Sequence, residues 1–228
     1  MKNINDVCIL VQARMGSQRI PRKMLKPFSN TTLVDILLSK LTLSKIIPQN
    51  NIVFSAYEQE LKEVVSKYNI TVFDRSKESA EAETSPPVVF EWWNKIPYKY
   101  VILVSACNPL LKLESIEKFF LEFLDSKEDS AFGVFEKKTY YWDKDKNSIT
   151  DYKGLTGMNT KLVDPVYEAA HCLYASRLDI IGDGFWMSKT SPPTPQLVVI
   201  NELESFDIDE QWQFDIAEQL YKNSKEST

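Results

Sequence analysis

The chain has only one histidine, three cysteines and no long apolar run. Cys8, Cys107 and Cys172 are odd in number and lie in apolar surroundings, which favours buried free thiols over disulfides or a zinc site. No apolar stretch approaches the ~20 residues that cross a bilayer, and residues 1–6 contain no apolar signal-peptide core. We therefore expect a cytoplasmic protein with no membrane partner.

An excess of positive charge is also absent. The chain has 27 Lys and Arg residues against 32 Asp and Glu residues, a formal net charge of −5. Nonspecific nucleic-acid binding needs a basic field, so we expect no nucleic-acid partner. One segment departs from this balance and suits a small anion such as a nucleoside triphosphate. Its cations are Arg14, Arg19, Arg22, Lys23 and Lys26.

A length of 228 residues is enough for one α/β domain with a sizeable core. We expect a single domain over residues 1–228. Up to residue 124, short apolar stretches alternate with amphipathic ones, a pattern that predicts strands, crossover helices and a parallel sheet. The predicted strands span 7–11, 51–56, 70–73 and 100–105, and the predicted helices span 31–41, 58–68, 86–93 and 114–124.

The pattern changes from Ser130 onward. Strand-like stretches at 131–135 and 140–142 are followed by a turn-rich piece at 143–160, so we expect an insertion or arm over 130–160. The regular pattern then resumes. It predicts strands over 168–175 and 196–200 and a last helix over 210–221.

The segment after the first predicted strand has the composition of a phosphate-binding loop. In open α/β sheets ligands collect beyond the strand ends, where backbone N–H groups of the following loop can meet an anion. Gly16 permits close backbone approach, and Pro21 stiffens the end of the loop. The segment lacks both the second glycine of a dinucleotide fingerprint and the Gly-Lys-Ser/Thr ending of a P-loop. The alternative is a basic surface turn.

Two aspartates near the other end of the chain are candidate metal ligands. Asp207 and Asp209 follow the strand predicted to end at Ile200, and residues two apart in extended chain point to the same side. Mg²⁺ prefers oxygen ligands, often one or two carboxylates with several waters. The same alternation is common on solvent-exposed edges, so the pattern alone leaves both interpretations open.

The loop resembles the opening motif of the CMP-sugar synthetases, a cytidylyltransferase family that includes the N-acylneuraminate and Kdo enzymes and spore-coat polysaccharide relatives. Their pattern, Ala-Arg-x-Gly-Ser-x-Arg-x-Pro-x-Lys, is complete here. The family closes with Asp-Ile-Asp and then an acidic, aromatic helix. The matching residues are Ala13, Arg14, Gly16, Ser17, Arg19, Pro21 and Lys23 in the loop, and Asp207, Asp209, Phe214, Ala217 and Glu218 at the end.

This resemblance implies a Rossmann-like three-layer α/β/α fold with a mostly parallel sheet and a small arm through which two copies form a homodimer. It also implies residue roles. Arg14, Lys23 and Asp209 are the expected catalytic residues, and Asp207 with Asp209 is expected to hold Mg²⁺ or Mn²⁺. The residues expected to bind CTP are Ala13, Arg14, Gly16, Ser17, Lys23, Arg75, Ser85 and Ser105.

The chain departs from the family in the segment from Ser105 to Leu110. Kdo and spore-coat relatives have an acidic metal ligand there, whereas this chain has Cys107, a poor ligand for Mg²⁺. The N-acylneuraminate branch also lacks that acid. Ser105 replaces the glutamine that contacts the sugar in that branch, which indicates a different or smaller acceptor.

The single histidine, His171, falls in a strand that borders the acceptor pocket in the family. Its imidazole could orient a carboxylate or accept a hydroxyl proton. The alternative is a hydrogen-bonded wall residue.

The sequence therefore predicts an enzyme that transfers CMP from CTP to a sugar acid of acylneuraminate or nonulosonate type, with release of pyrophosphate. Its expected partners are CTP and a small anionic acceptor. Two other interpretations stay open at this point. One is a cytidylyltransferase for a phosphonate or phosphorylated alcohol, and the other is a degenerate paralogue that only binds a nucleotide.

Overall fold

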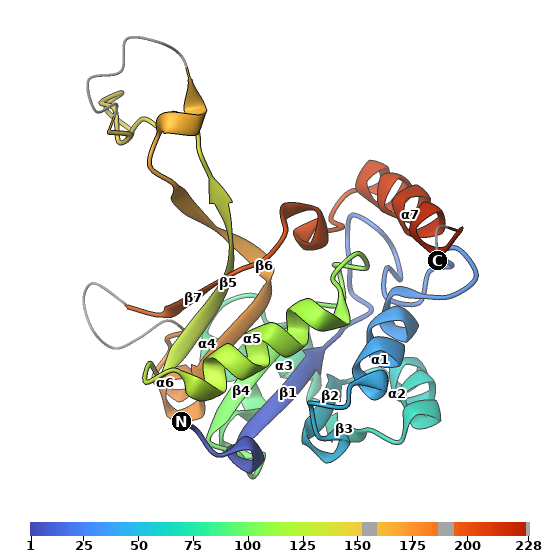
Figure 1. Ribbon diagram of the computed structural model, residues 1–228. Coiled ribbons are helices and arrows are strands. Elements are labelled where there is room, and N and C mark those ends of the chain that lie inside the picture. Colours follow the sequence, from blue (N-terminus) through green and yellow to red (C-terminus); the bar gives the residue numbers. More distant parts are fainter. Residues whose placement is uncertain (152–158, 187–193, 227–228) are drawn as a thin grey trace.

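The computed structural model describes residues 1–151, 159–186 and 194–226 (Figure 1). Its centre is a seven-stranded sheet in the order β3-β2-β1-β4-β6-β5-β7. The strands are β1 (Val7–Gln12), β2 (Ile52–Ala56), β3 (Thr71–Asp74), β4 (Tyr100–Val104), β5 (Ser130–Lys137), β6 (Val166–Arg177) and β7 (Gln196–Val199). The first four strands are mutually parallel and β7 is parallel to β5, whereas β6 is antiparallel to both β4 and β5. The predicted mostly parallel α/β sheet is confirmed.

Helices cover both faces of this sheet (Figure 1). The α-helices are α1 (Leu33–Leu43), α2 (Gln59–Val65), α3 (Lys77–Glu81), α4 (Pro86–Val89), α5 (Leu113–Asp125), α6 (Leu178–Gly182) and α7 (Gln211–Glu226). Short 3-10 helices lie at Ile4–Asp6, Gln49–Asn51, Ser66–Tyr68, Glu91–Asn94, Thr160–Leu162 and Glu202–Ser205. None of the described helices is both long and apolar enough to cross a membrane.

Strand β1 shows why the fold has three layers. All of its residues from Val7 to Val11 are fully buried, and alternate side chains enter two different cores. Val7, Ile9 and Val11 pack with α1 and α5. Cys8 and Leu10 pack with Trp92 and α6. A strand covered on both faces must be apolar throughout, which explains the uninterrupted run in the sequence.

Two predicted helices are divided in the structure. The segment predicted as one helix over 58–68 forms α2 up to Val65 and then a 3-10 helix. This 3-10 helix ends before Asn69, whose φ of +50° is left-handed. The segment 86–93 forms α4 and then a 3-10 helix, with an irregular residue, Phe90, between them. The other predicted helices agree with α1, α5 and α7 to within a few residues, except that α7 continues to Glu226.

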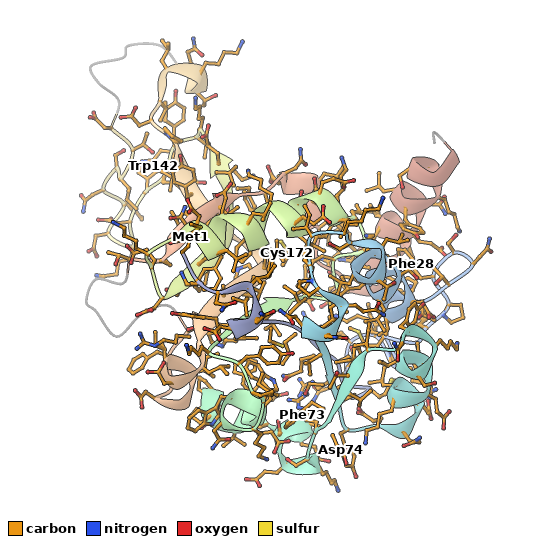
Figure 2. All side chains as sticks on the ribbon, turned by 60° about the horizontal axis from the view of Figure 1, so that its bottom comes forward. Met1, Phe28, Phe73, Asp74, Trp142 and Cys172 are labelled. Atoms are coloured by element: carbon orange, nitrogen blue, oxygen red, sulfur yellow. The ribbon has the colours of Figure 1, made fainter. Side chains whose placement is uncertain are left out.

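The arm is a continuation of β5 and β6 beyond the sheet (Figure 1). Residues 130–137 of the predicted arm are themselves strand β5. The predicted strand at 140–142 does not form, and only Trp142 pairs with Ser148 in an isolated bridge. Trp142 is 59% exposed on the arm, outside the body that contains Cys172 (Figure 2). Residues 152–158 of the predicted arm lie outside the described residues.

Candidate functional site

The cationic loop, residues 13–26, is fixed at its start by the strand and helix beside it. The Ala13 N–H donates to the Ser55 carbonyl at 3.1 Å, and the Met15 N–H donates to Glu58 Oε1 at 2.8 Å. Further along, Ile20 is fully buried in a small apolar cluster with Ile208 and Phe214. This cluster joins the loop to the segment that precedes α7, so residues nearly 190 positions apart in sequence lie together (Figure 1).

The charged groups of the two ends meet at this junction. Lys23 Nζ donates to the Ile208 carbonyl and lies 3.5 Å from Asp209 Oδ1. Arg19 Nη2 lies 2.9 Å from the same carboxylate oxygen. Lys23 is only 7% exposed, so its side-chain nitrogen lies where little solvent reaches it. A cavity of about 460 Å³ opens here, lined among others by Ala13, Arg14, Gly16, Ser17, Lys23, Cys107 and Asp209.

Backbone donors also point toward an available space. The N–H groups of Gly16, Ser17, Gln18 and Arg19 form no hydrogen bond with any part of the chain that the structure describes. No atom lies within 4 Å of the position that a Cβ on Gly16 would take, so this stretch of backbone is open. Consecutive free N–H groups beside cations form a suitable cradle for an oxyanion.

A recess of about 320 Å³ adjoins this cavity, and Arg14 lines both. Arg14 Nη1 donates to the Ala80 carbonyl at 3.2 Å, and Nη2 lies 3.7 Å from Glu83 Oε1. Gln12 also lines both spaces; its Oε1 accepts from Trp92 Nε1 at 2.7 Å. Gln12 and Glu83 could not be predicted as site residues, because the last residue of a strand and an acid between two short helices carry no pattern of their own.

Arg75 is buried in the wall of the same recess, with 3% of the residue exposed. Its Nε donates to Ser79 Oγ at 2.9 Å, and its Nη2 donates to the carbonyls of Ser79 and Val89. Burial, followed by repulsion from Arg14, lowers the pKa of Arg75 to about 10. The guanidinium is therefore still charged at neutral pH, and its Nη1 donates to none of the described residues.

Ser85 and Ser105 line neither space. Ser85 stands before α4 with a φ of +67°, and Ser105 Oγ accepts the Cys107 N–H at 3.1 Å within its own turn. Their predicted contacts with a nucleotide stay predictions.

Asp207 is placed differently from Asp209. Asp207 Oδ1 is buried and has no hydrogen-bond partner among the described residues. Burial, together with the charge of Asp209, raises the pKa of Asp207. An orphaned carboxylate oxygen beside a half-exposed second carboxylate fits a hard divalent cation. Within the described residues no three His, Cys, Asp or Glu side chains could hold an ion, so an ion here needs further ligands from phosphate and water.

Cys107, the thiol that stands where relatives have an acid, and His171, whose role the sequence left open, both interact electrostatically with Asp207. Cys107 lines the cavity, and burial raises the pKa of its thiol. His171 is exposed, at a φ of +52° in an irregularity of β6 opposite Gly133, and its Nδ1 lies 2.5 Å from Tyr174 Oη. The imidazole is close enough to Asp207 to lower the pKa of that carboxyl, although burial outweighs this effect.

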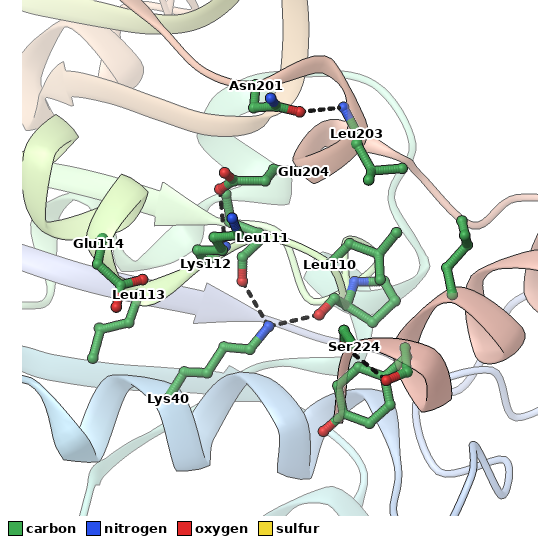
Figure 3. A pocket seen from close by; sticks show the side chains of 13 residues that line it. Lys40, Leu110, Leu111, Lys112, Leu113, Glu114, Asn201, Leu203, Glu204 and Ser224 are labelled. Atoms are coloured by element: carbon green, nitrogen blue, oxygen red, sulfur yellow. Dashed lines mark hydrogen bonds between the residues drawn. The ribbon is translucent and has the colours of Figure 1, made fainter. Parts of the chain in front are cut away.

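A larger cavity, of about 540 Å³, lies between α1, α5 and α7 (Figure 3). Lys40 crosses it and donates to the carbonyls of Pro109 and Leu111, each at 2.6 Å. None of the predicted nucleotide-binding or metal-binding residues lines this cavity. This cavity is larger but is not the candidate reaction site, because neither the N–H groups of residues 16–19 nor Asp207 lines it.

A mostly parallel α/β sheet carries a cationic loop after its first strand, and Asp209 is paired with two cations of that loop, an arrangement that suits a nucleoside triphosphate. Residues 8–181 match the family model described as cytidylyltransferase. The chain belongs to the cytidylyltransferase family and is a CTP-dependent nucleotidyltransferase. The acidic pair lies beyond the matched segment, so its role does not follow from that match.

Curated relatives agree with this family. The chain is 24% identical over its whole length to the pseudaminic acid cytidylyltransferase of Campylobacter jejuni, of which 99% is covered. It is 32% identical over 135 residues to the spore coat polysaccharide biosynthesis protein SpsF of Bacillus subtilis. That second match spans 57% of this chain and 54% of SpsF, about half of each protein.

Solved structures share the fold. A CMP:2-keto-3-deoxy-manno-octonic acid synthetase complexed with CTP superposes with a TM-score of 0.69 at 10% identity, covering 96% of this chain and 99% of the other. The 4-diphosphocytidyl-2C-methyl-D-erythritol synthase of Anaerococcus prevotii gives 0.67 at 13% identity, with 96% and 98% covered. At such identities the likeness concerns the fold alone.

Proposed function

We propose that this enzyme transfers CMP from CTP to a sugar acid of acylneuraminate or nonulosonate type and releases pyrophosphate. An acceptor hydroxyl oxygen attacks the α-phosphorus, the bond from that phosphorus to the bridging oxygen of the β-phosphate breaks, and the hydroxyl proton passes to the acceptor's own carboxylate or to water. The observation that carries the proposal is the shared cavity of Arg14, Lys23 and Asp209. The full-length match to a cytidylyltransferase named for pseudaminic acid supports the sugar-acid class.

The triphosphate is held by the cationic loop in this proposal. Lys23 supplies a nearly buried ammonium, and the free N–H groups from Gly16 to Arg19 supply fixed dipoles. Charge that develops on the leaving pyrophosphate is stabilised by such preorganised donors more than by water, because they need no reorganisation. Arg14 lines both spaces and therefore bridges the triphosphate and the nucleoside.

The nucleoside occupies the adjoining recess. Arg75 keeps Nη1 for a ligand carbonyl while its other donors are used within the wall. Gln12 and Ala13 form the neighbouring part of the lining. Because the Arg75 guanidinium is buried and held by three acceptors, it offers its donor in one fixed direction.

Asp207 and Asp209 would hold Mg²⁺ or Mn²⁺. Such an ion, when bound, neutralises phosphate charge and aligns the α-phosphate with the leaving group. Asp209 is paired with Arg19 and Lys23 in the structure. The triphosphate must therefore draw these two cations away before Asp209 can serve as a ligand.

We also propose that two copies form a homodimer through the arm. Four apolar side chains on or beside the arm are at least 45% exposed, and a contact between two copies would remove such apolar surface from water. They are Trp142, Ile149, Leu162 and Tyr167. Sedimentation equilibrium of the wild type and of Trp142→Ser tests this; a wild type that stays monomeric at micromolar concentration contradicts it.

The activity is tested by pyrophosphate release, crossing four nucleoside triphosphates with a panel of sugar acids, phosphonates and phosphorylated alcohols. We expect turnover with CTP and a nonulosonate, and loss of at least a hundredfold in Arg14→Ala and Asp209→Ala. Arg22→Ala is the matched control, because Arg22 pairs only with the exposed Glu60. Unchanged turnover in either site variant would refute its role.

The non-sugar acceptor stays a second candidate, because Ser105 Oγ is used within its own turn and does not line the cavity. Turnover of phosphonates or phosphorylated alcohols alone would favour it. CTP binding by calorimetry without any product would favour a nucleotide-binding paralogue.

A further inference from the structure

We infer that Glu58 is a positioning residue for the cationic loop, holding the backbone beside Arg14 so that the loop is preformed for the triphosphate. The inference rests on the proposed function of that loop. Its central observation is the hydrogen bond from the Met15 N–H to Glu58 Oε1, at 2.8 Å. This is a contact across 43 residues of sequence, between the loop and the start of α2.

The position of Glu58 makes the contact unusual. Glu58 is the residue just before α2, where a side chain normally accepts an N–H from the first turn of its own helix. Its side chain makes no such capping bond. The Glu58 backbone carbonyl accepts from Leu61 and Lys62, so the first turn of the helix forms without the carboxylate. The side chain is therefore free to reach the loop.

The carboxylate is costly to keep where it lies. Glu58 Oε2 is buried and has no hydrogen-bond partner among the described residues. A buried charged oxygen without a donor is unfavourable, so a neutral side chain would serve stability better. The charge has another effect in this place. It opposes the lowering of the Arg75 pKa that burial and Arg14 cause, so it makes two neighbouring guanidinium groups tolerable.

The loop is thus clamped on both sides of Arg14. Ala13 donates to Ser55, one residue before Arg14, and Met15 donates to Glu58, one residue after it. With both flanking N–H groups used, the Arg14 backbone has little freedom, and its side chain is aimed along the two spaces that it lines. The N–H of Gly16, which donates to none of the described residues, follows immediately. A preformed loop loses less conformational entropy when a ligand binds.

Three variants test the clamp. Glu58→Ala removes the acceptor, whereas Glu58→Gln keeps an oxygen for the Met15 N–H and removes the charge. Glu60→Gln is the matched control, since Glu60 lies in the first turn of the same helix and pairs only with the exposed Arg22. The two readouts are the Kd for CTP by calorimetry and amide hydrogen exchange of residues 13–19 without nucleotide.

We expect Glu58→Ala to weaken CTP binding about tenfold and to speed exchange of the Met15 amide, with KM for CTP rising more than kcat falls. Glu58→Gln should restore slow exchange of Met15 and most of the affinity, and Glu60→Gln should match the wild type. Slow Met15 exchange in Glu58→Ala, or a Glu58→Gln as impaired as Glu58→Ala, would overturn the inference. Failure of the wild type to bind CTP would instead refute the proposed function, and the exchange measurement would still decide the clamp.

Discussion

Phe214 joins the acidic segment to the loop, and its removal should separate the two ends of the site. The side chain is 3% exposed and meets the Phe28 ring edge to face, with centroids 5.1 Å apart. Phe214→Ala leaves a cavity next to Ile20 and Ile208. Truncation of a buried phenylalanine lowers the free energy of unfolding by about 3–5 kcal/mol. The edge-to-face contact of two rings contributes about 1 kcal/mol.

Urea unfolding followed by circular dichroism measures the loss in the free energy of unfolding of Phe214→Ala. For a domain of this size each kcal/mol lowers Tm by roughly 2–4 °C, so we expect a fall of about 6–20 °C. Because Ile208 and Asp209 are held against Lys23 through this cluster, turnover should fall even at temperatures where the variant is folded. Trp212→Ala is the control, since Trp212 is 58% exposed on the same helix and its loss should cost less than about 0.5 kcal/mol. A Phe214→Ala loss below about 1 kcal/mol, or full turnover in the folded variant, would refute the reasoning.

Two further predictions concern the carboxylates. Asp207→Asn should raise Tm at pH 7 while abolishing turnover. The folded state raises the pKa of Asp207, so the ionised carboxylate lowers the stability of the folded state at any pH above its unfolded pKa of about 3.9, and the gain in Tm should shrink as pH falls toward about 3.9. A gain in Tm that is constant with pH in differential scanning fluorimetry would contradict this. Arg19→Ala should raise the affinity for free Mn²⁺ about two- to fivefold without nucleotide, as expected for the loss of a half-exposed ion pair to Asp209. Electron paramagnetic resonance of free Mn²⁺ measures this affinity. Glu210→Gln is the control, because it leaves the Arg19–Asp209 pair intact. Equal Mn²⁺ affinities in the wild type, Arg19→Ala and Glu210→Gln would disprove competition between Arg19 and the metal for Asp209.

The parts of the fold that could be predicted are those whose burial leaves a periodic mark. The run from Val7 to Val11 is apolar because both faces of β1 are covered, and α5 shows its amphipathic spacing over nearly its full length. Strand direction leaves no such mark. The residues of β6 form a strand as predicted, but nothing in their composition distinguishes an antiparallel neighbour of β4 from a parallel one. The aromatic stretch 140–142 has strand composition but no neighbouring strand to pair with, except at Trp142.

The site divides in the same way. The meeting of Lys23 with Asp209 followed from the motifs at the two ends. Arg75 was also marked by its motif, but its burial and its three protein acceptors depend on how α3 and α4 fold back over it. Gln12, Glu58 and Glu83 were not found, because each acts through a partner far away in sequence. Glu58 in particular has the sequence context of an ordinary charged helix start.

The ionised groups around the cavity largely compensate one another's charge. Arg19 and Lys23 neutralise Asp209, and Glu83 lies beside Arg14, so each of these three cavity-lining cations has a carboxylate near it. Asp207 has no such compensation, because its Oδ1 is buried and has no hydrogen-bond partner in the described part of the chain. Bringing in a triphosphate alone would leave Asp209 without its cations and Asp207 still without a partner, which places uncompensated acids against phosphate. A divalent cation bound with the triphosphate removes both costs at once. Binding of nucleotide and metal should therefore be mutually strengthening, with a coupling that disappears in Asp207→Asn.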